Sequence, residues 1–111
     1  MSRIDQFEDM LETWVSNHAA DMLGCEILKS TLPETNPEQT DDMALTIVSV
    51  TVPESEINRI NDAMDADYHA FCEPFTRSAE FDIRQNNPVW ETRVFIDTES
   101  CTITFEVQYF I

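Results

Sequence analysis

The chain has 111 residues, of which 22 are acidic and six are basic, so its formal net charge at pH 7 is −16. An apolar content of 42% is too high for a disordered chain and fits one folded domain over residues 1–111. There is no apolar run of membrane-spanning length, no basic patch to meet nucleic-acid phosphates and no secretory signal, so we expect a cytoplasmic protein that binds neither membranes nor nucleic acid directly.

The first predicted element is an amphipathic helix over residues 3–23. Ser2 and Gly24 stand where such a helix is capped at its start and ended in left-handed geometry. Apolar spacing predicts a core stripe of Ile4, Phe7, Leu11, Trp14, Val15, His18 and Met22, widened by Met10, Ala19 and Leu23. Four acids lie on the opposite face, namely Asp5, Glu8, Asp9 and Glu12.

Two strands separated by an acidic loop are expected next. Residues 25–32 are predicted to form a strand, and residues 33–42 to form a Pro-containing loop that ends in Asp41 and Asp42. Residues 43–52 are a nearly unbroken run of Leu, Ile, Val and Thr. Such a run is typical of a strand that is covered on both faces or that changes face at a bulge.

A second helix is predicted over residues 54–73, between Pro53 and Pro74. Its expected core stripe consists of Ile57, Ile60, Met64, Tyr68 and Phe71. Asp62 and Asp65 lie outside this stripe, on the solvent side.

Three further strands complete the prediction. Residues 79–83 alternate apolar and charged side chains, and Asn86-Asn87-Pro88 marks a turn before a strand that includes Trp90. Residues 101–111 alternate most clearly. The sequence therefore predicts an α+β fold in the order α-β-β-α-β-β-β, in which two amphipathic helices pack on one face of a mainly antiparallel five-stranded sheet.

The acids are distributed unevenly along this fold. Residues 1–73 hold sixteen acids and three bases, whereas residues 74–111 hold six acids and three bases. We therefore expect an acidic helical layer and nearly neutral C-terminal strands.

Residues that could carry chemistry have simpler explanations. Asp62, Asp65 and His69 share one face of a continuous helix and could ligate a divalent metal, but a solvated acidic face is the favoured interpretation in so acidic a chain. His69 and Cys72 are one turn apart and could form a Cys–His pair with a nucleophilic thiolate. A cysteine beside the core stripe, however, is usually inert. Gly24 is the only glycine and cannot build a phosphate-binding loop alone. We expect no enzyme activity, no metal and no cofactor.

Trp90, Phe95 and Phe110 are the aromatic residues whose burial the pattern leaves open. Trp90 follows a turn and neighbours Val89, so its strand could be shifted, and Phe95 and Phe110 fall on the polar side of their strands. An exposed aromatic on a polar sheet face would be a contact candidate, and burial under a loop or in a dimer is an equal alternative.

The leading hypothesis is a small binding protein, an inhibitor whose acidic helical face docks onto a basic protein such as a nuclease, a toxin or a DNA-binding protein. In size, charge and architecture the chain resembles toxin-immunity proteins and phage anti-defence or DNA-mimic proteins. The expected partner-binding residues are Asp5, Glu8, Asp9, Glu12, Asp41, Asp42, Asp62 and Asp65. A secretion-type chaperone for an effector segment, an acidic halophile housekeeping protein and a homodimer stay open as alternatives.

Overall fold

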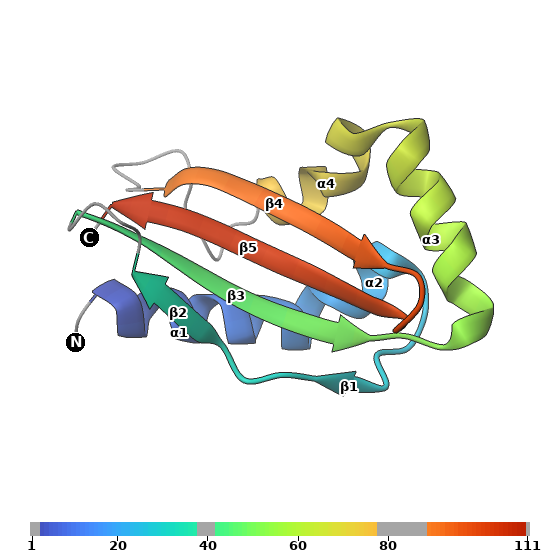
Figure 1. The fold of residues 1–111 in the computed structure, drawn as a ribbon, viewed down its shortest axis with the longest axis horizontal. Coiled ribbons are helices and arrows are strands. Elements are labelled where there is room, and N and C mark those ends of the chain that lie inside the picture. The colour runs from blue at the N-terminus through green and yellow to red at the C-terminus, as the bar shows by residue number, and fades with distance from the viewer. Residues whose placement is uncertain (1–2, 38–41, 78–88, 111) are drawn as a thin grey trace.

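The structure, a computed structural model, describes residues 3–37, 42–77 and 89–110. It confirms the α+β class and the mainly antiparallel five-stranded sheet. The strands lie in the order β1-β3-β5-β4, and β2 also pairs with β3, so β1 and β2 follow one another along the same edge (Figure 1). The bounds are Lys29–Ser30 for β1, Glu34–Pro37 for β2, Met43–Thr51 for β3, Val89–Asp97 for β4 and Thr102–Phe110 for β5.

The first helix covers residues 3–23 as predicted, but it is not a regular α-helix throughout. It consists of α1 (Arg3–Trp14), a π-helical turn η1 (Val15–Ala19) and α2 (Ala20–Leu23), and it ends at Gly24 with φ of 69°. The wider π-turn rotates the positions that follow it. Ala19 and Leu23, predicted to widen the core stripe, are buried, whereas His18, predicted to lie on the stripe itself, is exposed.

The strand and loop predicted over residues 25–42 are wrong in detail. The first strand is only the two-residue β1, and β2 forms within the segment predicted to be a loop. Pro37 at the end of β2 has no backbone N–H, which an edge strand tolerates. The pairing of β2 with β3 thus overrides the weak strand preference of its own residues.

The second helix is divided in two. α3 (Glu54–Ala66) ends at Asp67, which is extended with φ of −158° and accepts a hydrogen bond from the backbone N–H of Ala70 at 3.1 Å. Asp67 therefore caps a new helix, α4 (Tyr68–Thr76). Pro74 lies inside α4 rather than stopping the helix before it, and the helix ends within one turn after the proline.

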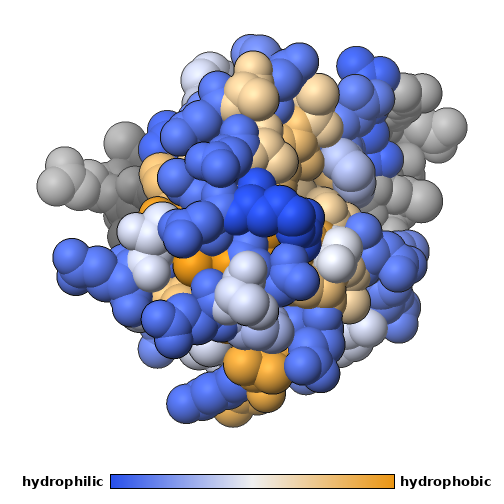
Figure 2. Space-filling model, turned by 90° about the vertical axis from the view of Figure 1, so that its right-hand side faces the viewer, coloured by the Kyte–Doolittle hydropathy of each residue, from blue (hydrophilic) through white to orange (hydrophobic). Residues whose placement is uncertain are grey.

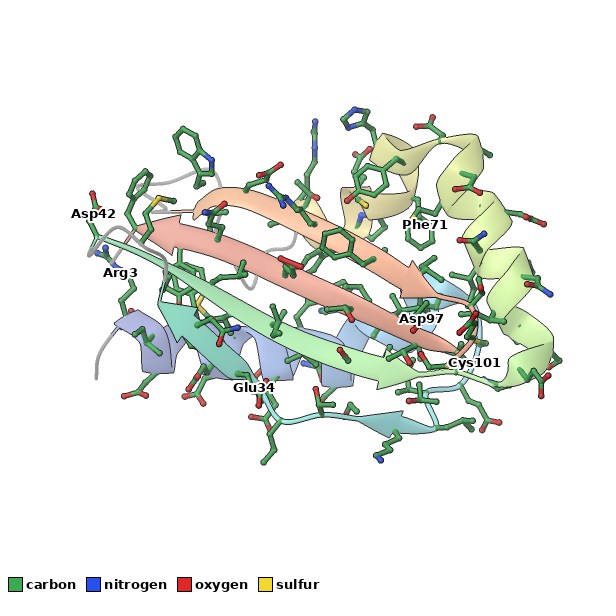
Figure 3. The ribbon with its side chains drawn as sticks, viewed as in Figure 1. Arg3, Glu34, Asp42, Phe71, Asp97 and Cys101 are labelled. Carbon is green, nitrogen blue, oxygen red and sulfur yellow. The ribbon has the colours of Figure 1, made fainter. Side chains whose placement is uncertain are left out.

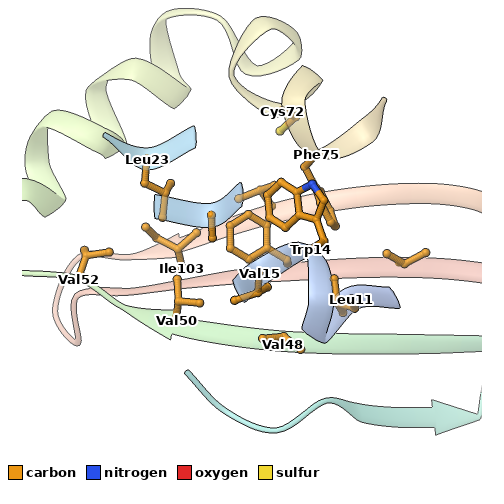
Figure 4. Close-up of a cluster of buried hydrophobic side chains, with 14 of the residues drawn as sticks. Leu11, Trp14, Val15, Leu23, Val48, Val50, Val52, Cys72, Phe75 and Ile103 are labelled. Atoms are coloured by element: carbon orange, nitrogen blue, oxygen red, sulfur yellow. The ribbon is translucent and has the colours of Figure 1, made fainter. Parts of the chain in front are cut away.

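The core lies between the sheet and the helices (Figure 4). Trp14 is fully buried, with its ring 4.8 Å from that of Phe75 and 5.1 Å from that of Phe105. From the strands, the inward side chains include Val48, Val50 and Ile103. The burial of Trp14 and Phe105 confirms the predicted inward faces of the first helix and the last strand.

The sheet has one covered face and one face that no described helix covers. In Figure 1, α1 and α2 lie behind the sheet, and α3 stands at the end where β3 finishes. Side chains of β3 alternate between buried and half-buried, so the apolar run of residues 43–52 neither changes face nor has helices on both sides. Leu45 and Ile47 are half-buried on the uncovered face because strands flank β3 on both sides.

The strand predicted over residues 79–83 and the turn at residues 86–88 lie outside the described residues. At Trp90 the register of β4 against β5 shifts between Val89 and Glu91, which confirms the predicted irregularity of this strand. Across the described ranges, no helix is long and apolar enough to span a membrane.

Candidate functional site

The acids of α1 lie on the surface that points away from the sheet. Asp5, Asp9 and Glu12 are exposed, while Phe7 and Leu11 on the opposite side of the helix are buried. This arrangement follows from the helical period, which places residues 5, 9 and 12 on neighbouring turns. The structure therefore brings these three expected partner-binding residues together.

Glu8 differs from the other three acids because it is bonded to the sheet. Its Oε2 accepts a hydrogen bond from the Thr35 hydroxyl at 2.6 Å. The Thr35 hydroxyl is 2.9 Å from that of Thr46, which is 2.7 Å from the hydroxyl of Tyr109. The ring of Tyr109 also stacks on Phe7 at 4.0 Å. Glu8 thus anchors α1 to three strands, a role that the helical pattern alone did not indicate.

Asp62 and Asp65 are exposed on α3, at the end of the molecule opposite the start of α1 (Figure 1). Figure 2 shows this end, where hydrophilic side chains surround small hydrophobic areas. The two helices therefore present two separate groups of acids within the helical layer, rather than one compact cluster.

The predicted acidic loop is only partly described. Asp41 lies outside the described residues. Asp42 is exposed directly before β3, at the same end of the molecule as Arg3 (Figure 3). It lies far from the acids of α3, so Asp42 could meet a partner together with α1 but not with α3.

The described basic residues leave four acids of α1 and α3 without an ion pair. Arg59 pairs with Glu56 at 2.7 Å and donates to the carbonyl of Leu23, and Arg77 pairs with Glu73 at 3.8 Å. Arg3 donates to the carbonyl of Phe110 at 2.8 Å. Among the described residues, Asp9, Glu12, Asp62 and Asp65 form no ion pair. These four carboxylates are left to solvent or to a partner.

The geometry supports neither a metal site at Asp62, Asp65 and His69 nor a reactive thiolate at Cys72. Asp62 and Asp65 lie on α3 and His69 on α4, because Asp67 ends the first helix, so the three no longer share one helical face. In the part of the chain that the structure describes, no three His, Cys, Asp or Glu side chains gather as a metal site would require. Cys72 is buried, and burial raises the pKa of its thiol.

Exposed apolar side chains gather on the uncovered face of the sheet. Trp90, Phe95 and Phe110 are 65%, 46% and 38% exposed, and the rings of Trp90 and Phe110 meet edge to face at 5.7 Å. Leu32, between β1 and β2, is 78% exposed and borders this face beside Ile47. We call this surface, formed by the outward side chains of β3, β4 and β5 with the β1/β2 edge, the outer sheet face.

The outer sheet face is shallow and has few charges. A hollow of about 210 Å³ is lined by Leu45, Glu91, Arg93, Glu106 and Gln108, and another of about 300 Å³ lies beside Leu32. Arg93 donates to Glu91 at 2.8 Å, and this hydrogen bond raises the pKa of the guanidinium. The sequence pattern indicated Phe95 and Phe110, but Leu32 was missed because it was assigned to the end of a strand predicted over residues 25–32, of which only Lys29–Ser30 forms.

The edge of β4 is capped by a side chain of α4. The hydroxyl of Tyr68 accepts from the backbone N–H of Val94 at 3.0 Å and donates to its carbonyl at 3.4 Å. Burial raises the pKa of this phenol. Tyr68 was predicted to lie on the core stripe, but the break at Asp67 directs it to the edge, where it satisfies groups that another strand could otherwise pair with.

Comparison with known proteins gives no relative from which a function could be transferred: no family model, no curated protein and no solved structure matches the chain.

Proposed function

We propose that the chain is a non-enzymatic binding protein whose acidic helical layer docks onto a basic protein that handles nucleic acid. Such a protein would act as an inhibitor of the toxin-immunity or DNA-mimic type. Its target would be a nuclease, a toxin or a DNA-binding protein. Two groups of exposed carboxylates lie in this layer, one on α1 and one on α3.

The observation that supports the proposal is that four of these acids lack a basic ion-pair partner among the described residues. Asp9, Glu12, Asp62 and Asp65 form no ion pair with any described residue, while most described arginines pair with glutamates of their own helix or strand. Uncompensated acids weaken the folded state by mutual repulsion, and a basic partner removes this cost. Carboxylates one turn apart, about 5 to 6 Å along the helix axis, can meet Lys and Arg groups that otherwise receive phosphates.

The test is a binding experiment with a charge-reversed helix. The double variant Asp9→Lys/Glu12→Lys should fold normally, because both side chains are exposed. A partner captured by the wild-type protein at low salt should associate about tenfold or more slowly with this variant, and its association should depend less on salt.

The matched control is Glu34→Lys with Glu91→Lys, which reverses two exposed acids of the sheet, outside the helical layer. This control should bind as the wild type does at every salt concentration. Equal association rates for wild-type protein and the α1 variant would remove α1 from the interface and contradict the proposal.

The outer sheet face favours a second candidate function, a chaperone that holds an apolar segment of another protein. Such a protein needs exposed apolar surface along its sheet, and Trp90, Phe95 and Phe110 supply it. The two candidates differ in their salt dependence, because apolar binding on the sheet persists at high salt whereas docking of the acidic helices is lost.

A further inference from the structure

The outer sheet face is an apolar surface that no described helix covers. It combines exposed aromatic residues with the half-buried side chains of Leu45 and Ile47 on the central strand β3. Side chains of this kind, on a flat surface with only shallow hollows, are typical of a protein interface rather than of a small-molecule site.

The charge of this face is nearly balanced, in contrast to the rest of the chain. Its described ionisable side chains are four acids and two bases: Glu34, Glu91, Asp97, Glu106, Lys29 and Arg93. The net charge here is −2, and Arg93 already lies beside Glu91. Two copies of a chain with a net charge of −16 repel least when they approach through this surface.

The size of the face reaches the lower bound for a specific interface. β3, β4 and β5 have nine residues each and are about 30 Å long at about 3.3 Å per residue, and the six residues of β1 and β2 add about 20 Å along the neighbouring edge. At about 4.8 Å of width per strand the flat area is about 530 Å², which just exceeds the roughly 500 Å² per partner that the smallest specific interfaces need, before side-chain relief is counted.

From these three observations we infer that a second copy of this chain covers the outer sheet face and forms a two-fold dimer with the sheets face to face. Phe95, Phe110 and Trp90 lie in the interface, and the helical layers lie on the two outer sides. The sheets alone separate these layers by about 10 Å, more than the Debye length of about 8 Å at physiological salt, so repulsion between the acids of α1 in the two copies is screened.

The dimer predicts a salt dependence opposite to that of docking on a basic partner. Salt screens the repulsion between two negatively charged copies and leaves apolar burial intact, so dimerisation strengthens as salt is added. Docking of the acidic helices on a basic protein weakens under the same conditions. Failure of the dimer would not affect the proposed function, since the acids of α1 and α3 belong to the other layer.

The test is the mass in solution of the purified protein, measured by sedimentation over a range of protein concentrations at low and high salt. Wild-type protein should approach about 25.6 kDa, twice the chain mass of 12.8 kDa, at a lower concentration in high salt than in low salt. Phe95→Glu should stay at the monomer mass, while Ala63→Glu, which adds the same charge at an exposed position of α3, should dimerise nearly as well as wild type.

Circular dichroism shows whether each variant is folded, and Phe95→Ser serves as a second probe of the face if the glutamate variant does not fold. A wild-type mass of 12.8 kDa under every condition overturns the inference and leaves the face to a segment of another protein. Dimerisation of folded Phe95→Glu at the wild-type concentration overturns it as well, because the interface would then lie elsewhere.

Discussion

The helical layer and the outer sheet face differ in how their charges are compensated. On α1 and α3, Asp9, Glu12, Asp62 and Asp65 have no ion pair with a described residue, whereas on β4 the guanidinium of Arg93 lies 2.8 Å from Glu91. The helical layer carries acids without ion pairs and only small apolar areas, whereas the sheet carries aromatic surface with little net charge. The two surfaces therefore suit different kinds of contact, one governed by electrostatics and one by apolar burial.

Aromatic residues on the covered and the outer face of the sheet should differ in how much they contribute to the free energy of unfolding. This difference is the largest expected effect. Trp14→Ala should lower the free energy of unfolding by about 3 to 5 kcal/mol, because the ring is fully buried against Phe75 and Phe105. Phe95→Ala, measured at a concentration where the protein is monomeric, should change it by less than about 0.5 kcal/mol. Chemical denaturation measures both values, and equal costs would mean that Phe95 is buried within the monomer.

The hydrogen-bond chain that joins the two layers gives the next effect. Thr46→Val removes the hydroxyl that lies between Thr35 and Tyr109 and should cost about 1 to 3 kcal/mol, because the buried Tyr109 hydroxyl loses the partner that lies 2.7 Å away. In a double-mutant cycle with Tyr109→Phe, the second substitution should cost less in the Thr46→Val background than in the wild type. Additive costs would show that the chain does not act as a unit.

A smaller effect is expected at the capped edge of β4. Tyr68→Phe removes the hydroxyl that bonds the N–H and carbonyl of Val94 and should cost about 0.5 to 1.5 kcal/mol. Hydrogen exchange of the Val94 amide should become faster than in the wild type, while exchange at Phe105 in the neighbouring strand changes little. Unaltered exchange at Val94 would mean that other groups protect this edge.

The smallest expected effect is a pH-dependent change in thermal stability from Asp97, which precedes the turn between β4 and β5. Hydrogen bonds from Ser100, and then from the backbone N–H groups of Glu99 and Ser100, hold the pKa of Asp97 below its ordinary value of 3.8. A carboxyl whose pKa is lowered by folding stabilises the protein above the unfolded-state value, and this contribution is lost as the pH falls through the folded-state value.

Asp97→Asn should therefore melt at a slightly lower temperature than wild-type protein at neutral pH. The two melting temperatures should converge below the ordinary Asp pKa of 3.8. A difference that stays constant with pH would show that the Asp97 charge does not contribute to the stability of the turn.

The sequence was sufficient to predict the elements whose own periodicity is strong. The helix over residues 3–23 and the last strand, with Trp14 and Phe105 on their buried sides, follow from spacing alone. The π-turn at Val15–Ala19 and the pairing of β2 with β3 did not follow, because both depend on contacts between distant segments. The cap at Asp67 was missed because the apolar spacing continues past it. In the sequence, an Asp that ends a helix cannot be told from an Asp on the solvent side of one.

The candidate site was predicted only in part. Exposure of the acids on α1 and α3 follows from the helical pattern, but the bond between Glu8 and Thr35 could not be predicted because β2 was not. Similarly, the separation of His69 from Asp62 and Asp65 depends on the break at Asp67. The exposure of the acidic side chains was therefore easier to predict from the sequence than the hydrogen bonds and ion pairs that they form.

The difference between the two surfaces is tested most directly by titrating isotope-labelled protein with a short oligolysine peptide and following its amide signals by NMR. The account predicts that the signals of Asp9, Glu12, Asp62 and Asp65 shift, that the shifts disappear at high salt, and that those of Phe95 and Thr104 do not move. Shifts concentrated on the outer sheet face, with α1 and α3 unchanged, would contradict it.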